Sequence, residues 1–149
     1  MALSLGTNCG FVTSAPSSDP NGSAVTSDDS SFVVKHTSPS SNTKITEIGW
    51  YKASGTTSSN FQVGLYSANG AVVPGEAGTR LFVSSDAASG TSAGWKVISG
   101  LNWDISPNTV YWIGVQQDAH TGSSQIDSAT SGGSGIDTKT SQTDLTDPY

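Results

Sequence analysis

Thiols and charges are both scarce in this chain of 149 residues. Cys9 is its one cysteine, so an internal disulfide and a cysteine-based metal site are both excluded. Charged residues make up only 12% of the chain, and the six Lys and Arg residues are spread singly along a sequence of net charge -6. Because the phosphates of DNA and RNA demand clustered cations, this composition argues against nucleic acid as a partner.

Long apolar runs are also missing, and no stretch approaches the roughly 20 residues that a membrane-spanning helix needs. Residues 1–8 lack a basic leader and a continuous apolar stretch, so we expect no signal peptide in this chain and no membrane partner. No segment has a convincing amphipathic helical period. Ser, Thr, Gly and Asn are poor helix formers, whereas Thr, Val, Ile and the aromatic residues suit pleated strands. The composition therefore favours β-sheets.

Two stretches, residues 61–66 and 111–116, share one pattern: an aromatic start, strict alternation and a central glycine. Alternate side chains on a strand point to opposite faces of its sheet. One face is predicted to form the core, with Phe61, Val63, Leu65, Tyr111, Ile113 and Val115. The opposite face carries Gln62, Tyr66, Trp112 and Gln116. Large rings in that position need a cover or a use, because a solvated face normally shows small polar groups.

Further strands are predicted between turns rich in Gly, Pro and Asn. All the predicted strands together span residues 31–36, 43–52, 60–67, 80–84, 94–98 and 109–117. Short strands without helices indicate an all-β fold, a jelly-roll-like antiparallel β-sandwich of about seven or eight strands with one core. We divide the chain into an irregular N-terminal arm (1–30), a sandwich domain (31–121) and a Ser/Gly-rich C-terminal tail (122–149).

Five short motifs follow one another within about half of the chain. They are ITEIGWY (45–51), VGLYS (63–67), PG (74–75), GW (94–95) and TVYWIGV (109–115). Together they resemble a sandwich domain common in phage virion proteins and in extracellular bacterial proteins. The resemblance implies a β-sandwich used as a virion decoration, a tail or fibre module, or a sugar-binding module. Fold alone does not fix which of these functions applies.

Residues capable of catalysis show no recognisable arrangement. His120 lies close to Asp118, but no activated Ser motif, metal-type His spacing or phosphate-binding Gly loop accompanies the pair. Asp28 and Asp29 offer oxygen ligands for calcium without the regular spacing of a calcium loop. We interpret His120 as an ordinary surface residue and the acidic stretch as a solvated loop. The sequence therefore predicts no enzyme, no cofactor and no metal site.

Tyr66 and Trp112 are the strongest binding candidates, with Gln62 and Gln116 as hydrogen-bonding neighbours. Three interpretations of these outer rings stay open. They can face a second core or a covering loop, form an interface with another subunit, where Tyr and Trp are enriched, or stack on the apolar face of a sugar. We predict that the remaining tryptophans belong to the core: Trp50, Trp95 and Trp103.

These features together predict a non-enzymatic structural surface protein that acts through protein–protein contacts. The setting that we expect is a phage virion, with the protein as a capsid decoration or a tail-associated module beside other virion subunits. Polar arms that order on binding favour a homo-oligomer. The alternative is an extracellular carbohydrate-binding module or adhesin with a glycan as ligand. We accordingly expect the protein on a virion surface or outside the cell.

Overall fold

The computed structural model describes residues 10–12, 15–19, 23–26, 29–41, 43–54, 58–68, 77–118, 125–128, 136–141, 144–147 and 149. These residues form strands and no helix, which confirms the predicted all-β class. The strands are β1 (Ser23–Thr26), β2 (Ser30–Thr37), β3 (Lys44–Ser54), β4 (Asn60–Ser67), β5 (Arg80–Val83), β6 (Ala87–Ala88), β7 (Gly94–Asp104), β8 (Val110–Asp118), β9 (Gln125–Ser128) and β10 (Ile136–Thr140).

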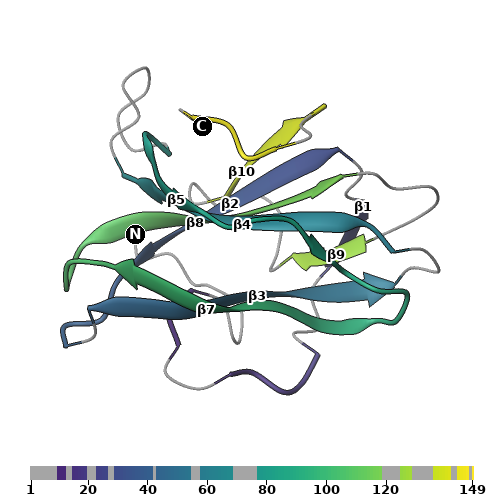
Figure 1. The fold of residues 1–149 in the computed structure, drawn as a ribbon, viewed down its shortest axis with the longest axis horizontal. Coiled ribbons are helices and arrows are strands. Elements are labelled where there is room, and N and C mark those ends of the chain that lie inside the picture. The colour runs from purple at the N-terminus through teal and green to yellow at the C-terminus, as the bar shows by residue number, and fades with distance from the viewer. Residues whose placement is uncertain are drawn as a thin grey trace.

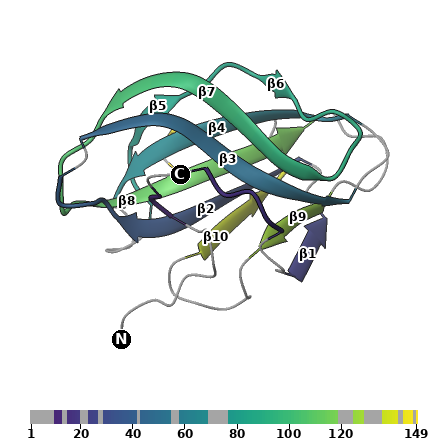
Figure 2. The same cartoon turned by 90° about the horizontal axis from the view of Figure 1, so that it is seen from below.

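Two antiparallel sheets lie one above the other (Figure 1). One has four strands in the order β1-β9-β3-β7, and the other has the order β10-β2-β8-β4-β5, with the two-residue β6 beside β4. Figure 2 shows the same two layers from the side of β3 and β7. The predicted antiparallel β-sandwich is therefore confirmed, while its jelly-roll connectivity stays a prediction.

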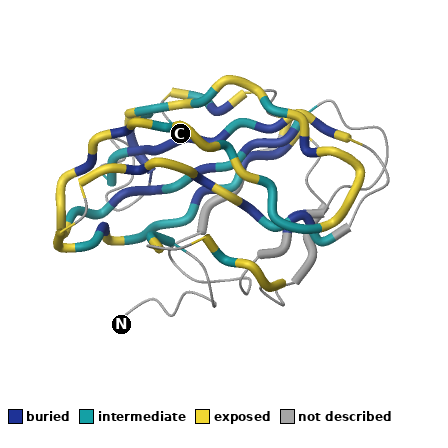
Figure 3. Tube along the Cα trace, turned by 60° about the horizontal axis from the view of Figure 1, so that its bottom comes forward, coloured by how far each residue is buried: buried dark blue, intermediate teal, exposed yellow. Residues whose placement is uncertain are grey.

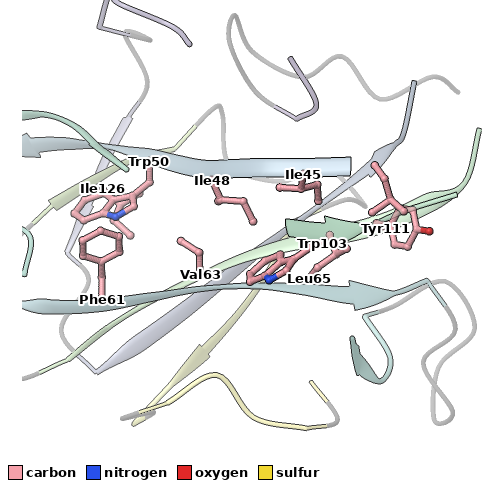
Figure 4. Packing of buried hydrophobic residues seen from close by; sticks show 10 residues of the cluster. Ile45, Ile48, Trp50, Phe61, Val63, Leu65, Trp103, Tyr111 and Ile126 are labelled. Carbon is pink, nitrogen blue, oxygen red and sulfur yellow. The ribbon is translucent and has the colours of Figure 1, made fainter. Parts of the chain in front are cut away.

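The main core lies between the sheets, where side chains of β3 and β4 point toward one another (Figure 4). Phe61, Val63 and Leu65 are at most 2% exposed, as their alternation predicts. The ring of Trp50 meets Phe61 edge to face, with centroids 5.5 Å apart. Aromatic pairs in this geometry contribute about 0.5–1.5 kcal/mol beyond their buried area. The core assignment of Trp50 is therefore correct.

A second aromatic contact joins the edges of the two sheets. Trp103 of β7 stacks on Phe82 of β5, with centroids 5.3 Å apart and ring planes only 9° from parallel. Trp103 is 9% exposed, so its predicted core position is confirmed.

The two stretches with matching sequence patterns are neighbouring interior strands, β4 and β8. Their register pairs Gly64 with Gly114, and Tyr66 with Trp112. Consecutive residues of β4 are buried from Val63 to Tyr66, so this strand is covered on both faces. Figure 3 shows the buried segments concentrated in such interior strands. The face away from the four-stranded sheet is therefore covered as well.

The two ends of the chain contribute strands to the sandwich, which differs from the predicted division into arm, domain and tail. β1 lies in the predicted arm, and β9 and β10 lie in the predicted tail. β1 pairs with β9 on the four-stranded sheet, and β10 pairs with β2 on the other. Strand pairing uses backbone groups, so short polar segments can join a sheet without an apolar pattern that reveals them.

Candidate functional site

The outer face of β2, β8 and β4 holds a second apolar cluster, which we call the outer cluster. Its members are Val33, Tyr66, Ala77, Trp112 and Leu145, with Tyr149 packed against them. Tyr66 is 0% and Trp112 is 2% exposed, so the predicted binding rings are buried. Of the three interpretations, the second core describes their observed environment.

The cover is a C-terminal segment of residues 144–147 and 149, which we call the strap. The C-terminus lies on the side of the six-stranded sheet that faces away from β3 and β7 (Figure 1). Leu145 of the strap is fully buried, although its neighbours Asp144 and Asp147 are exposed. One leucine in a polar segment therefore anchors the strap to the outer face.

Gln62 and Tyr66 hold the strap by hydrogen bonds. The Gln62 side chain donates from Nε2 to Oδ1 of Asp144 over 2.9 Å, and its Oε1 accepts from the Leu145 backbone N–H over 3.1 Å. The Tyr66 hydroxyl donates to the carbonyl oxygen of Thr146 over 2.9 Å. These two predicted site residues thus contact the protein's own C-terminal segment.

Arg80 at the start of β5 makes two further contacts with the strap. Its backbone N–H donates to Oδ1 of Asp147 over 2.9 Å. Its guanidinium donates to the carbonyl oxygen of Leu145. The backbone N–H of Tyr149 donates to the carbonyl oxygen of Gly78 over 3.2 Å, in the segment that leads into β5. The strap is therefore fixed to the edge of the sheet as well as to its centre.

Tyr149 closes the outer cluster. The Tyr149 ring meets Tyr66 edge to face, with centroids 5.4 Å apart. Its hydroxyl donates to the Ser31 carbonyl oxygen over 3.1 Å and lies 3.2 Å from Ser31 Oγ. An aromatic ring with one polar end thus bridges β4 and β2.

The paired glycines of β4 and β8 form the floor under the strap. A Cβ at Gly64 would lie 2.7 Å from Cδ1 of Leu145, which is closer than carbon atoms approach. A Cβ at Gly114 would lie 3.1 Å from Cγ1 of Val33 and 3.3 Å from Cε2 of Tyr66. Bare backbone at these two positions therefore makes room for the leucine and the tyrosine ring.

Burial and charge set the titration of the groups around the outer cluster. Burial raises the pKa of Tyr66 far above its ordinary value of 10.0, although the positive charge of Arg80 acts in the other direction. The phenol is therefore protonated, as its hydrogen bond to the strap requires. Trp112 lies under Lys35, whose Nζ is 5.5 Å from the ring centroid. This cation–π contact covers part of the remaining ring surface.

Carboxylates gather around the end of β8. Burial raises the pKa of Asp118, and the negative charges of Asp86, Asp144 and Asp29 raise it further. Within the described ranges, no group of three His, Cys, Asp or Glu residues is placed to hold a metal ion. No described helix has the length and hydrophobicity needed to cross a membrane.

A different aromatic pair lies on the outer face of the four-stranded sheet. Tyr51 and Trp95 are cross-strand partners in edge-to-face contact, with centroids 5.6 Å apart. Trp95 is only partly buried, and its Nε1 donates to the carbonyl oxygen of Ser18 over 3.0 Å. The predicted core position of Trp95 is wrong, because its register with Tyr51 places it on the outer face. Val97 beside it is 44% exposed.

Lys52 is a buried polar residue that the sequence pattern does not reveal. It is 0% exposed, and its Nζ donates to the Gly90 carbonyl oxygen over 2.7 Å and to Ser89 Oγ over 3.3 Å. Burial, together with the positive charge of Lys96, lowers its pKa. Alternate residues of a strand share a face, so Lys52 lies on the same inward face of β3 as Trp50, two residues before it.

The other candidates have structural surroundings or lie outside the described residues. His36 accepts a hydrogen bond at Nδ1 from the backbone N–H of Phe11 over 3.3 Å. The phenyl ring of Phe11 packs against the same imidazole. Asp29 is exposed, whereas Asp28 and His120 lie outside the described residues, as does Cys9.

Comparisons with protein-family models, curated proteins and solved structures find no match to this chain. The resemblance to phage and extracellular sandwich domains therefore stays a prediction.

Proposed function

We propose that this protein is a non-enzymatic structural surface module that works through protein–protein contacts. A phage virion, with the protein as a capsid decoration or tail-associated component, is the setting that we propose. The observation that supports contact with other proteins is the position of the exposed aliphatic side chains. Of the four large hydrophobic residues that are exposed in the described part of the chain, three lie on β5 and β7. Both are edge strands of the sandwich.

Edge strands carry backbone N–H and C=O groups that are free to pair with another chain. Soluble proteins commonly protect such edges with charged side chains. Here Leu81 and Val83 of β5 are 43% and 37% exposed, and Val97 of β7 is 44% exposed. A neighbouring subunit could pair with the edge backbone groups and bury these apolar side chains in the same interface.

The edge proposal is tested by measuring mass in solution over a wide concentration range. The wild type is expected to associate, and Val83→Lys and Val97→Lys are expected to weaken that association. Ser85→Lys and Asn102→Lys are matched controls, because both add the same charge at exposed positions near the two patches. A reductant keeps Cys9 from linking copies. A wild type that stays monomeric at every concentration contradicts the proposal.

The virion setting has a separate test in the genes that flank the reading frame. Capsid or tail genes beside it, together with the protein's presence in purified particles, are the expected result. A neighbouring or fused carbohydrate-degrading domain would instead favour the second candidate function.

That second candidate is glycan binding, and the Tyr51–Trp95 pair is the observation that favours it. Sugars present apolar C–H faces that stack on aromatic rings. This surface is more suitable than the predicted Tyr66 and Trp112, which the strap covers. A glycan array with the wild type, Trp95→Ala and the same-face control Ser99→Ala tests it. Binding that is lost only in Trp95→Ala supports the site, and absence of binding to any glycan contradicts it.

A further inference from the structure

The strap is held by residues far from it in sequence. Its hydrogen bonds go to Gln62, Tyr66 and Arg80, which lie 65 to 83 positions away along the chain. Its aromatic end contacts Ser31, 118 positions away. None of these contacts depends on the strap belonging to the same molecule. An identical strap from a second copy would make the same set.

The outer face of β2, β8 and β4 is apolar and needs a segment that covers it. Tyr66 and Trp112 are buried with Leu145 in one cluster, so a face without a strap would expose two large rings. The space above Gly64 is filled by the Leu145 side chain. A contiguous apolar patch of this kind in water favours association. The segment whose side chains fit it is the strap itself.

Ser141, between β10 and the strap, has an unfavourable backbone conformation. Ser141 directly follows β10 and has a φ of 59°, in the left-handed region. This region disfavours a residue other than glycine by roughly fivefold or more at equilibrium. We call Ser141 the hinge. If the chain extended at the hinge and led away from its own sheet, Ser141 would leave this conformation. Strained hinges of this kind favour exchange of a terminal segment between copies.

We propose that the strap exchanges between two copies of the chain, so that residues 144–147 and 149 of each copy cover the outer cluster of the other. The inference rests on the proposed function, and it names a second copy as the partner. Reciprocal exchange forms a closed dimer with two equivalent interfaces. Val83 pairs with Gly64 across β4 and β5, so it lies on the same face as the strap. The second copy therefore arrives beside an exposed apolar edge.

The hinge gives a matched pair of variants for the first experiment. Ser141→Gly adopts the left-handed turn without strain, which favours the closed monomer. Ser141→Val disfavours that turn, which favours the exchanged dimer. With two hinges in each dimer, Ser141→Gly is expected to raise the dimer dissociation constant about 25-fold, from a fivefold effect per hinge. Ser141→Val is expected to lower it.

A complementation experiment tests exchange directly. The acceptor is a chain that ends after residue 143, so its outer face is uncovered. The donor carries Gly64→Val, whose side chain would clash with Leu145 and so blocks the donor's own outer face. Mixed under reductant, the two are expected to form a one-to-one heterodimer. A control donor that also carries Leu145→Asp is expected not to pair with the acceptor.

The outcomes separate exchange from the broader proposed function. Equal dissociation constants for both hinge variants, with no heterodimer in the mixture, would overturn exchange. Association that Val83→Lys weakens would still support the edge contacts in that case. Conversely, association that responds to the hinge but not to either edge lysine would support exchange and contradict the edge contacts. If a donor or an acceptor fails to fold by circular dichroism, the full-length hinge pair alone decides the question.

Discussion

Truncating Leu145 is the most direct test of the strap, because this side chain is 0% exposed and touches the glycine floor. Leu145→Ala removes three carbons, which corresponds to about 2.4 kcal/mol at about 0.8 kcal/mol per buried carbon. Leucine-to-alanine changes in cores cost about 2–5 kcal/mol once the cavity is included. The strap lies outside the strands and can move to fill part of that cavity. We therefore expect the free energy of unfolding to fall by about 2–3 kcal/mol.

Urea unfolding, followed by tryptophan fluorescence, measures this change. With a slope of about 2 kcal/mol/M, the midpoint should fall by about 1–1.5 M. The thermal midpoint should fall by about 5–10 °C. The emission of Trp112 should also shift toward that of a solvated indole, because the same cluster covers its ring.

Leu81→Ala, measured at a concentration where the protein is monomeric, is the matched control, since it makes the same chemical change at a position that is 43% exposed. Surface substitutions usually change stability by less than about 0.5 kcal/mol. If Leu145→Ala also stays within about 0.5 kcal/mol of the wild type, Leu145 does not anchor the strap. That result would refute the second core and the exchange proposal together.

Three further predictions concern polar groups. Tyr66→Phe removes the hydrogen bond from the Tyr66 hydroxyl to the Thr146 carbonyl oxygen. It should lower the free energy of unfolding in urea by about 1 kcal/mol and speed hydrogen exchange in the strap. The folded state raises the pKa of Asp118 above its ordinary value of 3.8, so its charged form destabilises the fold at pH values above 3.8. Asp118→Asn should therefore stabilise the protein at pH 7. This gain should vanish below about pH 3.8, where the carboxyl is protonated in the folded and the unfolded state. Burial lowers the pKa of Lys52 in the folded state, so its charged form destabilises the fold at pH values below this lowered pKa. The destabilisation is relieved as the pH rises from the lowered pKa toward 10.5. The free energy of unfolding of the wild type should therefore rise in this pH range relative to that of Lys52→Met. Equal curves for Lys52→Met and the wild type, or a gain from Asp118→Asn that persists at pH 3, would contradict these assignments.

The sheet structure of the central strands could be predicted because the alternation of apolar and polar residues indicates which side chains face the core. Phe61, Val63 and Leu65 are buried as that pattern requires. Trp95 is predicted in the core but lies on the outer face of its sheet. Its face depends on register with Tyr51, and register between distant strands is set by pairing that local sequence does not reveal.

The cover of the outer face could not be predicted from local patterns. The strap has one large aliphatic residue, and a lone leucine among polar residues has the composition of a loop. Its burial comes from contacts with β4 and β5, far away in sequence. Only the three-dimensional structure shows that Leu145 and Tyr66 belong to one cluster.

The paired glycines nevertheless carried a usable signal. Glycine weakens a strand interior, so a glycine in a central strand indicates that something approaches its backbone closely. Gly64 and Gly114 face each other across β4 and β8, and each lies in a stretch with an outward-facing ring two residues away. Two bare backbone positions beside two large rings indicate a close approach to the outer face, but they do not state whether a ligand or a segment of the chain makes it. The structure identifies Leu145 of the strap as the group above Gly64, so the rings of Tyr66 and Trp112 are covered by the chain itself.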